Sequence, residues 1–527
     1  MRLLPILAAA LLAVPAHAQA PADTTDYSRR YAATITAADL EKHLRVLASD
    51  EYEGRETGQK GQKMAAAYIA KDFAANGLAG PVAGSADDPH YQHFELTRTV
   101  WADVALEVKG RKLEYLKDYF PVGAADLPRG AKLKPVFVGY GIEDDKHSDY
   151  TGADVRGKVV VMRQGEPTEA SGVSPYTGNT TRSTWTTDVN RKLALAHQKG
   201  AVAVILIADR TEQNFRDWMP RAAPHLREAR VGLPGAAGGA TVPAMVVSPA
   251  VGSALLGVGD AGKSNADARR AGLAPGLALK PRIRFRSRAE TTPFQTENVL
   301  GYVAGTDKKD ELLILSAHYD HLGIRDGKVY NGADDDGSGT VAVLEMAQAF
   351  AQAKKEGHGP RRSLLFLAVT GEEKGLLGSE YYAEHPVFPL ANTVVDLNTD
   401  MIGRLDDAHA QDPNYVYVIG DDKLASDLHR INQEQNRRYV SLKLDYTFND
   451  PADPNRFYYR SDHYNFARKG IPVAFFFNGV HADYHQETDE VSKILFPKME
   501  RITRLVFHTA WEIANREERL KVDSNKP

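Results

Sequence analysis

Five short clusters of histidine and carboxylate residues in the C-terminal half of the chain hold the side chains best suited to chemistry. They are His318-Tyr319-Asp320, Asp334-Asp335-Asp336, Glu372-Glu373, Asn398-Thr399-Asp400 and Tyr484-His485. Imidazole and carboxylate groups are donors that zinc binds, and two imidazoles with three or four carboxylates are enough for a pair of cations. The set therefore predicts a hydrolytic centre with two metal ions.

The first cluster pairs a candidate ligand with a candidate supporting group. His318 and Asp320 are two residues apart at the end of an apolar run, so in an extended segment their side chains lie on one face. A carboxylate beside a metal-bound imidazole fixes its tautomer and strengthens it as a donor. We therefore assign His318 to metal and the Asp320 carboxylate to holding its ring.

The next two clusters are groups of adjacent acids. Asp334, Asp335 and Asp336 repel one another unless a cation neutralises them, so one of the three is expected to bridge two cations. Glu372 and Glu373 can divide the work, one binding metal and the other accepting a proton from water. Two acids placed to satisfy a helix dipole are the alternative reading of that pair.

These clusters need a scaffold that brings strand ends together. From residue 298 onward, strand and helix patterns alternate, which predicts an α/β fold with a mixed, mainly parallel sheet flanked by helices. In such sheets, ligand sites form beyond the carboxyl ends of the strands. The expected strands are 312–317, 363–370, 393–398 and 471–477, and the expected helices are 341–353, 376–384 and 498–514.

The middle of the chain has a different character. Short β-rich runs alternate with loops rich in Gly, Ser, Thr and Pro, and no metal-type cluster occurs there. We expect an inserted β-rich module over 131–270, which divides the catalytic domain into 36–130 and 271–518, with a polar tail over 519–527.

The first residues predict export. A positive charge at Arg2, an apolar run over 3–14 and the ending Ala16-His17-Ala18 are the parts of a secretory signal over 1–18. The run is shorter than the ~20 residues that span a bilayer, which disfavours the alternative of an N-terminal anchor. We expect cleavage after Ala18, a flexible leader over 19–35, and a periplasmic or secreted protein.

Composition excludes several other classes of protein. The chain has no cysteine, so disulfides, thiolate metal sites and a cysteine nucleophile are impossible. The net charge is −4 with both signs interspersed, and no basic block favours a nucleic-acid or membrane-surface partner. No segment after the signal is long and apolar enough to span a membrane.

The ordered motifs resemble the M28 family of di-zinc aminopeptidases. The insert resembles the protease-associated (PA) domain of some members, through 157–162 and 199–204. The stretches that carry the likeness to the peptidase are 47–55, 317–323, 332–339, 371–373, 398–403, 461–463 and Tyr484-His485.

This resemblance implies a role for each residue. The zinc ligands would be His318 and Asp400 for one ion, Glu373 and His485 for the second, and Asp335 as the bridge. Glu372 would be the general base, Tyr484 would help to stabilise the oxyanion, and the Asp335-Asp336 peptide bond would be cis. Arg460 and Asp462 are candidates for substrate contact. The substrates would be peptides with a free N-terminus.

Other activities are compatible with the same scaffold. These are carboxypeptidase or dipeptidase action, single-zinc cyclisation of an N-terminal glutamine, or a receptor-like homologue without catalysis. The sequence leaves open the preferred N-terminal residue, the role of the insert and the oligomeric state.

Overall fold

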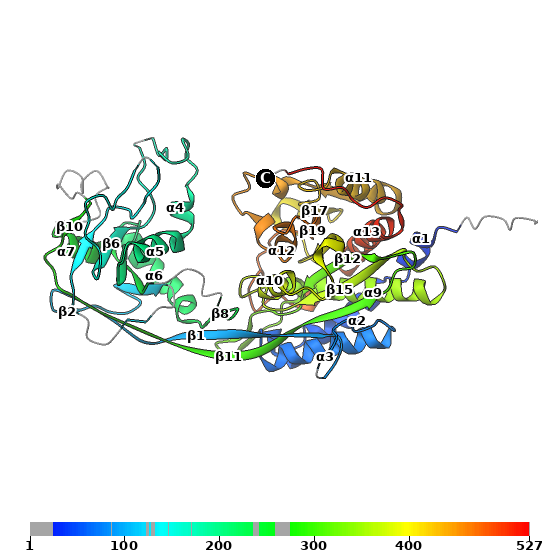
Figure 1. Cartoon of the computed structure of the whole chain (residues 1–527). Helices are drawn as coiled ribbons and strands as arrows, with labels where there is room; N and C mark the ends of the chain where they lie inside the picture. Colours follow the sequence, from blue (N-terminus) through cyan, green and yellow to red (C-terminus); the bar gives the residue numbers. More distant parts are fainter. Residues whose placement is uncertain are drawn as a thin grey trace, which may run out of the picture.

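Two α/β units joined by a long two-stranded ribbon make up the computed structural model of the chain (Figure 1). The structure describes residues 25–85, 87–122, 126–127, 132–145, 147–169, 171–235, 242–258 and 275–525. The predicted signal sequence over 1–18 lies outside the described residues. The predicted fold class, a mixed sheet flanked by helices, is confirmed.

The larger unit is built on a sheet with four parallel strands at its centre. In sheet order these are β19 (Val473–Phe477), β16 (Thr393–Thr399), β12 (Lys308–His318) and β15 (Arg362–Val369). Antiparallel neighbours flank them, with β17 (Tyr415–Ile419) beside β19 and β11 (Ile283–Val303) beside β15. Each parallel strand overlaps a strand that the sequence predicts.

Both faces of this sheet are covered by helices. Successive strand residues point to opposite faces, so Leu313 and Leu315 enter one hydrophobic layer while Leu312 and Ile314 enter the other. Because both faces are buried, a shift of one residue would move apolar side chains to the wrong layer, which fixes the strand register. The helices are α2 (Ala37–Leu47), α3 (Lys60–Ala75), α9 (Gly339–Lys355) and α13 (Phe496–Asn515) on the first face, and α10 (Leu377–Glu384) and α12 (His463–Ala467) on the second.

The predicted flexible leader and the predicted polar tail both contribute side chains to the core. The described part of the leader forms α1 (Tyr27–Ala32), and Tyr31 and Ile35 are fully buried. In the predicted polar tail, Leu520 is buried in the same core. These apolar side chains are isolated within polar stretches, so the sequence shows no periodicity there; burial comes from contact with the rest of the core.

The smaller unit contains a six-stranded sheet whose four central strands are parallel. They are β5 (Pro135–Phe137), β6 (Val159–Arg163), β7 (Ala203–Ile207) and β9 (Ala244–Val247), with β10 (Leu277–Ala278) and β3 (Tyr119–Val122) at the edges. Helices α5 (Val189–Gln198), α6 (Glu212–Arg227) and α7 (Pro249–Leu256) cover it. The edge strands fall outside the predicted 131–270 module, because their long-range pairing leaves no local pattern.

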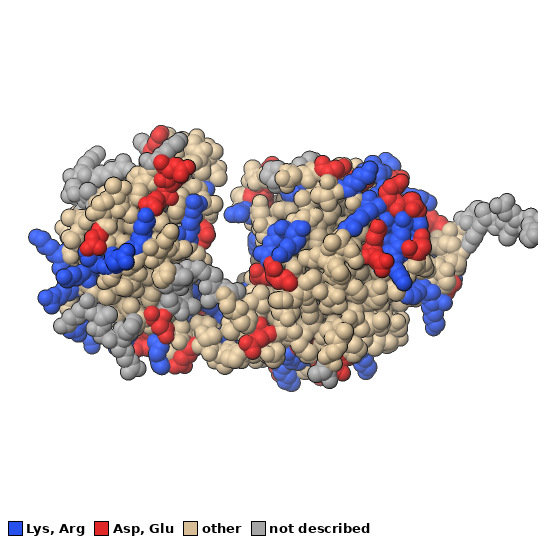
Figure 2. Space-filling model, viewed as in Figure 1, with Lys and Arg blue, Asp and Glu red and all other residues tan. Residues whose placement is uncertain are grey.

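The ribbon that joins the units consists of β1 (Tyr91–Val108) and β11, paired antiparallel from Tyr91–Val299 to Val108–Ile283. Its inner end belongs to the large sheet, while Leu106 and Phe285 at the outer end pack in the core of the small unit. Figure 2 shows two lobes separated by a hollow above this ribbon, with charges of both signs spread over the visible face. Among the described residues, no helix combines the length and apolarity needed to cross a membrane.

Candidate metal centre

The predicted site residues converge at the carboxyl ends of the four parallel strands. His318 ends β12, Glu372 and Glu373 follow β15, and Asp400 follows β16. His485 lies in the loop after β19, and Asp335 belongs to the turn segment η2 (Ala333–Ser338) that leads into α9. Parallel strands that share a register place their following loops at one edge, so residues far apart in sequence meet there.

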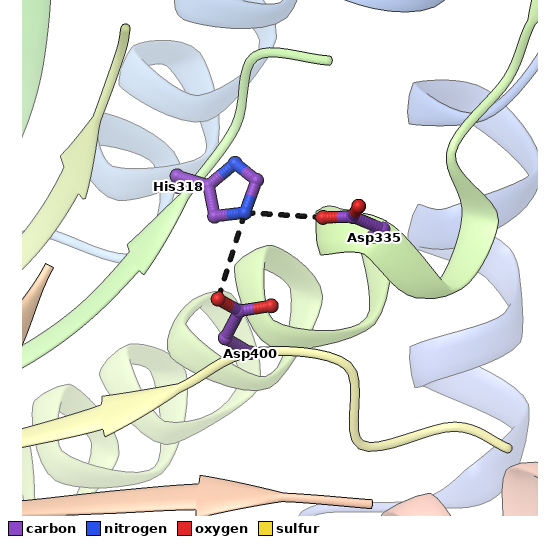
Figure 3. Close-up of side chains that lie close together, drawn as sticks. All are labelled: His318, Asp335 and Asp400. Atoms are coloured by element: carbon purple, nitrogen blue, oxygen red, sulfur yellow. Dashed lines mark ion pairs between the residues drawn. The ribbon is translucent and has the colours of Figure 1, made fainter. Parts of the chain in front are cut away.

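One donor set surrounds the His318 ring. Its Nε2 lies 3.3 Å from Asp335 Oδ1 and 3.8 Å from Asp400 Oδ2. Figure 3 shows the imidazole facing both carboxylates, which reach it from the segment before α9 and from the end of β16. All three residues are buried. The three atoms are spaced to share one cation.

A second donor set uses the other oxygen of the same aspartate. Asp335 Oδ2 lies 3.1 Å from His485 Nε2, which is 3.2 Å from Glu373 Oε2. Asp335 thus presents Oδ1 to one imidazole and Oδ2 to another. This is the arrangement of a carboxylate that bridges two cations. The Asp335-Asp336 peptide bond is cis, as the resemblance implies.

Several atoms of these two sets are buried and lack hydrogen-bond partners among the described residues. They include His318 Nε2, Asp335 Oδ2 and Glu373 Oε1. An unsatisfied buried polar atom costs about 1–3 kcal/mol, so a cluster of them is costly unless a cation binds. The nitrogen and oxygen donors present fit zinc.

Glu372 lies beside the first donor set, with Oε2 3.8 Å from His318 Nε2. Burial raises the pKa of its carboxyl well above the usual range, and the charges of Glu373 and Asp400 add to this against the opposing effect of His318. A carboxylate with a raised pKa accepts a proton more readily near neutral pH, which suits a general base.

Asp335 shows the opposite shift. Burial acts to raise the pKa of its carboxyl, but hydrogen bonds to His318 and His485 lower it well below the usual range. Asp335 is therefore held as a carboxylate, the form that binds cations.

Asp320 holds His318, but not in the way that the spacing predicts. His318 Nδ1 lies 3.0 Å from the main-chain carbonyl of Asp320, whereas the Asp320 carboxylate oxygen is 3.7 Å from that nitrogen. The carboxylate accepts hydrogen bonds from Thr57 Oγ1 (2.6 Å) and from the main-chain N–H of Glu372 (3.2 Å). The prediction is wrong about the atom, because the turn after β12 brings the carbonyl closer to the ring than the side chain.

Two residues missed by sequence reasoning also belong to this region. Ser461 Oγ donates a hydrogen bond to Asp400 Oδ2 (2.7 Å) and accepts one from Asn398 Nδ2 (2.8 Å), so it fixes that carboxylate. His321 is fully buried, and its Nδ1 is 2.8 Å from Glu373 Oε1. Its place directly after Asp320 in an already recognised motif is the sequence signal that could have found it.

A pocket opens beside the His318 donor set. Tyr484 Oη lies 3.1 Å from an Arg460 guanidinium nitrogen at its wall, and burial raises the pKa of the Tyr484 phenol, which keeps its hydrogen. Asp462 does not line this pocket and instead accepts a hydrogen bond from Ser379. The lining side chains are Asp335, Glu372, Asp400, Met401, Phe457, Arg460, Phe475, Phe477, Val480 and Tyr484.

Comparisons with known proteins agree with this geometry. Residues 298–510 match the model of Peptidase family M28, and residues 129–255 match that of the PA domain. Among solved structures, an aminopeptidase from Aneurinibacillus sp. strain AM-1 is 19% identical with a TM-score of 0.58, over 95% of this chain and 100% of that one. At 19% identity, this likeness shows a shared fold and no more.

Two curated relatives match part of the chain. One, "Probable glutamate carboxypeptidase AMP1" of Arabidopsis thaliana, is 27% identical over 53% of this chain and 39% of its own length. The other, "Probable zinc metalloprotease" of Pyricularia oryzae, is 33% identical over 24% of this chain and 25% of its own length. The chain thus spans well under half of these relatives. Together, the family matches, the fold and the donor geometry show that residues 298–510 form a domain of peptidase family M28, a family of zinc metallopeptidases, and that the chain also carries a PA domain.

Proposed function

We propose that this chain is a di-zinc aminopeptidase that removes N-terminal residues from peptides. The observation that carries the proposal is the position of Asp335, whose two oxygens face two separate histidine–carboxylate sets. His318, Asp335 and Asp400 would hold one zinc ion, and Asp335, Glu373 and His485 would hold the other.

Zinc in these positions supplies Lewis-acid chemistry, since it acidifies water and polarises a carbonyl group. Glu372 accepts the proton of the attacking water and returns it to the nitrogen of the leaving amine. Its main-chain N–H is held by the Asp320 carboxylate, which fixes the segment that carries this base.

Tyr484 is positioned to stabilise the oxygen that becomes negative during attack. Its phenol keeps its hydrogen because burial raises its pKa, and it accepts a hydrogen bond from Arg460 that polarises the O–H group. A preorganised donor of this kind acts where charge develops in the transition state.

The pocket supports recognition of the substrate N-terminus. Asp335, Glu372 and Asp400 give one wall a negative character, which suits the ammonium group of a free N-terminus. The remaining wall includes Met401, Phe457 and Phe475, and these residues would receive a large apolar side chain. We therefore expect a preference for apolar N-terminal residues.

Carboxypeptidase action at the same centre is the second candidate. It is favoured by the likeness to a probable glutamate carboxypeptidase and by Arg460, an exposed cation at the pocket wall that suits a substrate carboxylate. Export, predicted from residues 1–18, remains part of the proposal.

The general base is tested by Glu372→Gln. Loss of a general base typically costs about 10²–10⁴-fold in rate, so release of the residue from an aminoacyl anilide should fall by that factor while bound zinc is unchanged. Glu380→Gln, an acid on α10 outside the pocket, is the matched control and should keep full activity. Normal activity of the Glu372 variant would refute the proposal.

Peptides with one blocked terminus distinguish recognition of the substrate N-terminus from recognition of its C-terminus. An aminopeptidase should cleave a peptide with a free N-terminus and an amidated C-terminus, and should spare its N-acetylated, C-terminally free counterpart. The reverse preference would replace the aminopeptidase with the carboxypeptidase.

A further inference from the structure

A row of buried polar side chains leads from Asp400 into the second face of the large sheet, and the proposed mechanism does not use it. Asp396 and Asn398 lie two residues apart on β16, and Ser316 on β12 pairs with Asn398 in the ladder. Ser461 connects Asn398 to Asp400. Since the four members of this polar row are buried, each of their polar atoms needs a partner, and the direction of every hydrogen bond matters.

The hydrogens of the polar row can be placed one by one from the Asp400 end. A metal-binding Asp400 is a carboxylate, which only accepts hydrogen bonds. The single hydroxyl hydrogen of Ser461 goes to Asp400 Oδ2 (2.7 Å), so the Ser461 oxygen accepts from Asn398 Nδ2 (2.8 Å). This orients the Asn398 amide, whose Oδ1 lies 3.0 Å from Ser316 Oγ. An amide oxygen has no hydrogen, so the single hydrogen of Ser316 belongs to this contact.

Asp396 is left to supply the last hydrogen. Its Oδ1 lies 2.7 Å from Ser316 Oγ, whose own hydrogen is already used. Two oxygens at this distance repel unless a hydrogen lies between them, and a protonated carboxyl provides one. The other oxygen of Asp396, Oδ2, is buried without a hydrogen-bond partner among the described residues, which costs less for a neutral acid than for a carboxylate.

The surroundings of Asp396 also favour its neutral form. Burial raises the pKa of its carboxyl to about 8 against the opposing hydrogen bond with Ser316, and the charge of Asp462, which precedes α12, adds to the shift. His463, at the start of α12, and Tyr382, on α10, reach the same face of the sheet. Burial lowers the pKa of His463 to about 3 and raises that of Tyr382, so both are neutral near pH 7. None of these three groups supplies a positive charge that would hold Asp396 as a carboxylate.

We propose that Asp396 is a positioning residue whose carboxyl is protonated at neutral pH and orients Asp400 through the polar row. All four hydrogen bonds of the row then point towards Asp400, so a directed series of donors fixes the oxygen that receives the last of them. Ionisation of Asp396 would turn the Ser316 hydroxyl towards it and leave Asn398 Oδ1 without its donor. This inference rests on the proposed function, in which Asp400 binds zinc.

Asp396→Asn tests the direction of the polar row. An asparagine amide donates to Ser316 at every pH, whereas Asp396 stops donating as it ionises above about pH 8. In competition with a chromophoric chelator, the wild type and the variant should bind Zn²⁺ equally at pH 6.5. At pH 9 about nine-tenths of a carboxyl with this pKa is ionised, so the wild type should bind Zn²⁺ up to about 10-fold more weakly than the variant. The metal ligands are common to both proteins, so the ratio of the two affinities isolates Asp396.

Infrared spectroscopy observes the proton itself. The difference spectrum of the wild type minus Asp396→Asn at pH 6.5 should contain the C=O stretching band of a protonated carboxyl. This band should disappear towards pH 9, over the same range in which the two zinc affinities separate.

Ser316→Ala distinguishes an effect through the polar row from an effect of charge alone. The variant interrupts the row, so in this background Asp396→Asn should no longer change zinc affinity at any pH. A negative charge on Asp396 that acted through space would instead strengthen zinc binding by the wild type at pH 9, because it attracts the cation. Equal or tighter binding by the wild type at pH 9, or an effect of Asp396→Asn that persists beside Ser316→Ala, would overturn the proposal.

Asp421→Asn is the matched control for replacement of a buried carboxyl. Asp421, in the loop after β17, is fully buried and accepts hydrogen bonds from His429 and Asn432, outside the polar row. This variant should keep the weaker zinc binding of the wild type at pH 9, and loss of that weakening would contradict the assignment to Asp396. A wild type that binds no zinc would refute the proposed function and the link to metal, whereas a missing carboxyl band would refute this inference alone.

Discussion

Both units of this chain arrange four parallel strands side by side and send polar loops from the carboxyl ends. In the large unit these loops carry the two donor sets around Asp335. In the PA domain the corresponding loops carry Glu166, after β6, and Asp209, after β7. The same sheet geometry thus presents charged groups in both places.

The charged groups differ in their partners. Glu166 in the PA domain accepts hydrogen bonds from the main-chain N–H and hydroxyl of Ser183. Lys192 is buried nearby and donates to the main-chain carbonyl of Gly165, and burial lowers its pKa to about 8. In contrast, His318 Nε2, Asp335 Oδ2 and Glu373 Oε1 have no hydrogen-bond partner among the residues that the structure describes. Unsatisfied donor atoms that converge, and not the sheet itself, distinguish the reactive centre.

The largest effect should come from Asp335→Asn. A neutral amide cannot bridge two cations, so both zinc affinities should fall, and loss of Lewis-acid chemistry worth several kcal/mol should reduce activity by about 10³-fold or more. Elemental analysis and an aminoacyl-anilide assay measure this. Glu166→Gln, the same change at a strand end of the PA domain, should leave both unchanged. Loss of zinc from the Glu166 variant would contradict the conclusion that only the strand-end acids of the large unit bind metal.

A smaller effect is expected for Ser461→Ala. The variant removes the hydrogen bond to Asp400 Oδ2 and leaves the carboxylate in place, and changes of this kind cost about 10–100-fold in metal affinity or activity. Chelator competition measures it. Ser183→Ala, which removes a hydroxyl donor to Glu166, is the control with no expected effect on zinc. Equal zinc affinity in Ser461→Ala and wild type would show that this hydrogen bond is dispensable.

The smallest effect concerns the free energy of unfolding. It tests whether a single buried carboxyl without hydrogen-bond partners is enough to bind metal. Both oxygens of Glu345, on α9, lack hydrogen-bond partners within the part of the chain that the structure describes, and His43 Nε2 lies 3.5 Å from its Oε1. Burial raises its pKa to about 8, with the charges of Asp39 and Asp72 adding to the shift. A raised pKa in the folded state stabilises the fold fully below about pH 4.5, and this contribution is lost as pH rises towards 8.

Glu345→Gln should remove this dependence. Relative to the variant, the wild type should lose roughly 3 kcal/mol of unfolding free energy between pH 5 and pH 8, measured by urea titration. Glu434→Gln, on the half-exposed surface of α11 (Ser426–Gln435), should show no such change. If zinc stabilises the wild type and Glu434→Gln against unfolding but does not stabilise Glu345→Gln, then Glu345 binds metal.

Several features of the fold were predictable because their signal is local. Each parallel strand of the large unit has an apolar run, and the polar residue that follows it marks where the strand ends. The order of strands and helices then favours a parallel sheet, which brings His318 and Asp400 to the same edge although 82 positions separate them. The edge strands β3 and β10 have no such signal, because pairing with a distant strand defines them.

Composition and local sequence patterns establish which donors are available, that cysteine is absent, and that the donors follow strands of an α/β sheet. Tertiary structure decided that the carbonyl and not the carboxylate of Asp320 holds His318, and that His321 meets Glu373. It also decided that Tyr31 and Leu520 are buried. The physical reason is that strand periodicity depends on neighbours in sequence, whereas hydrogen bonds, unsatisfied atoms and burial depend on which distant segments come within a few ångströms of each other.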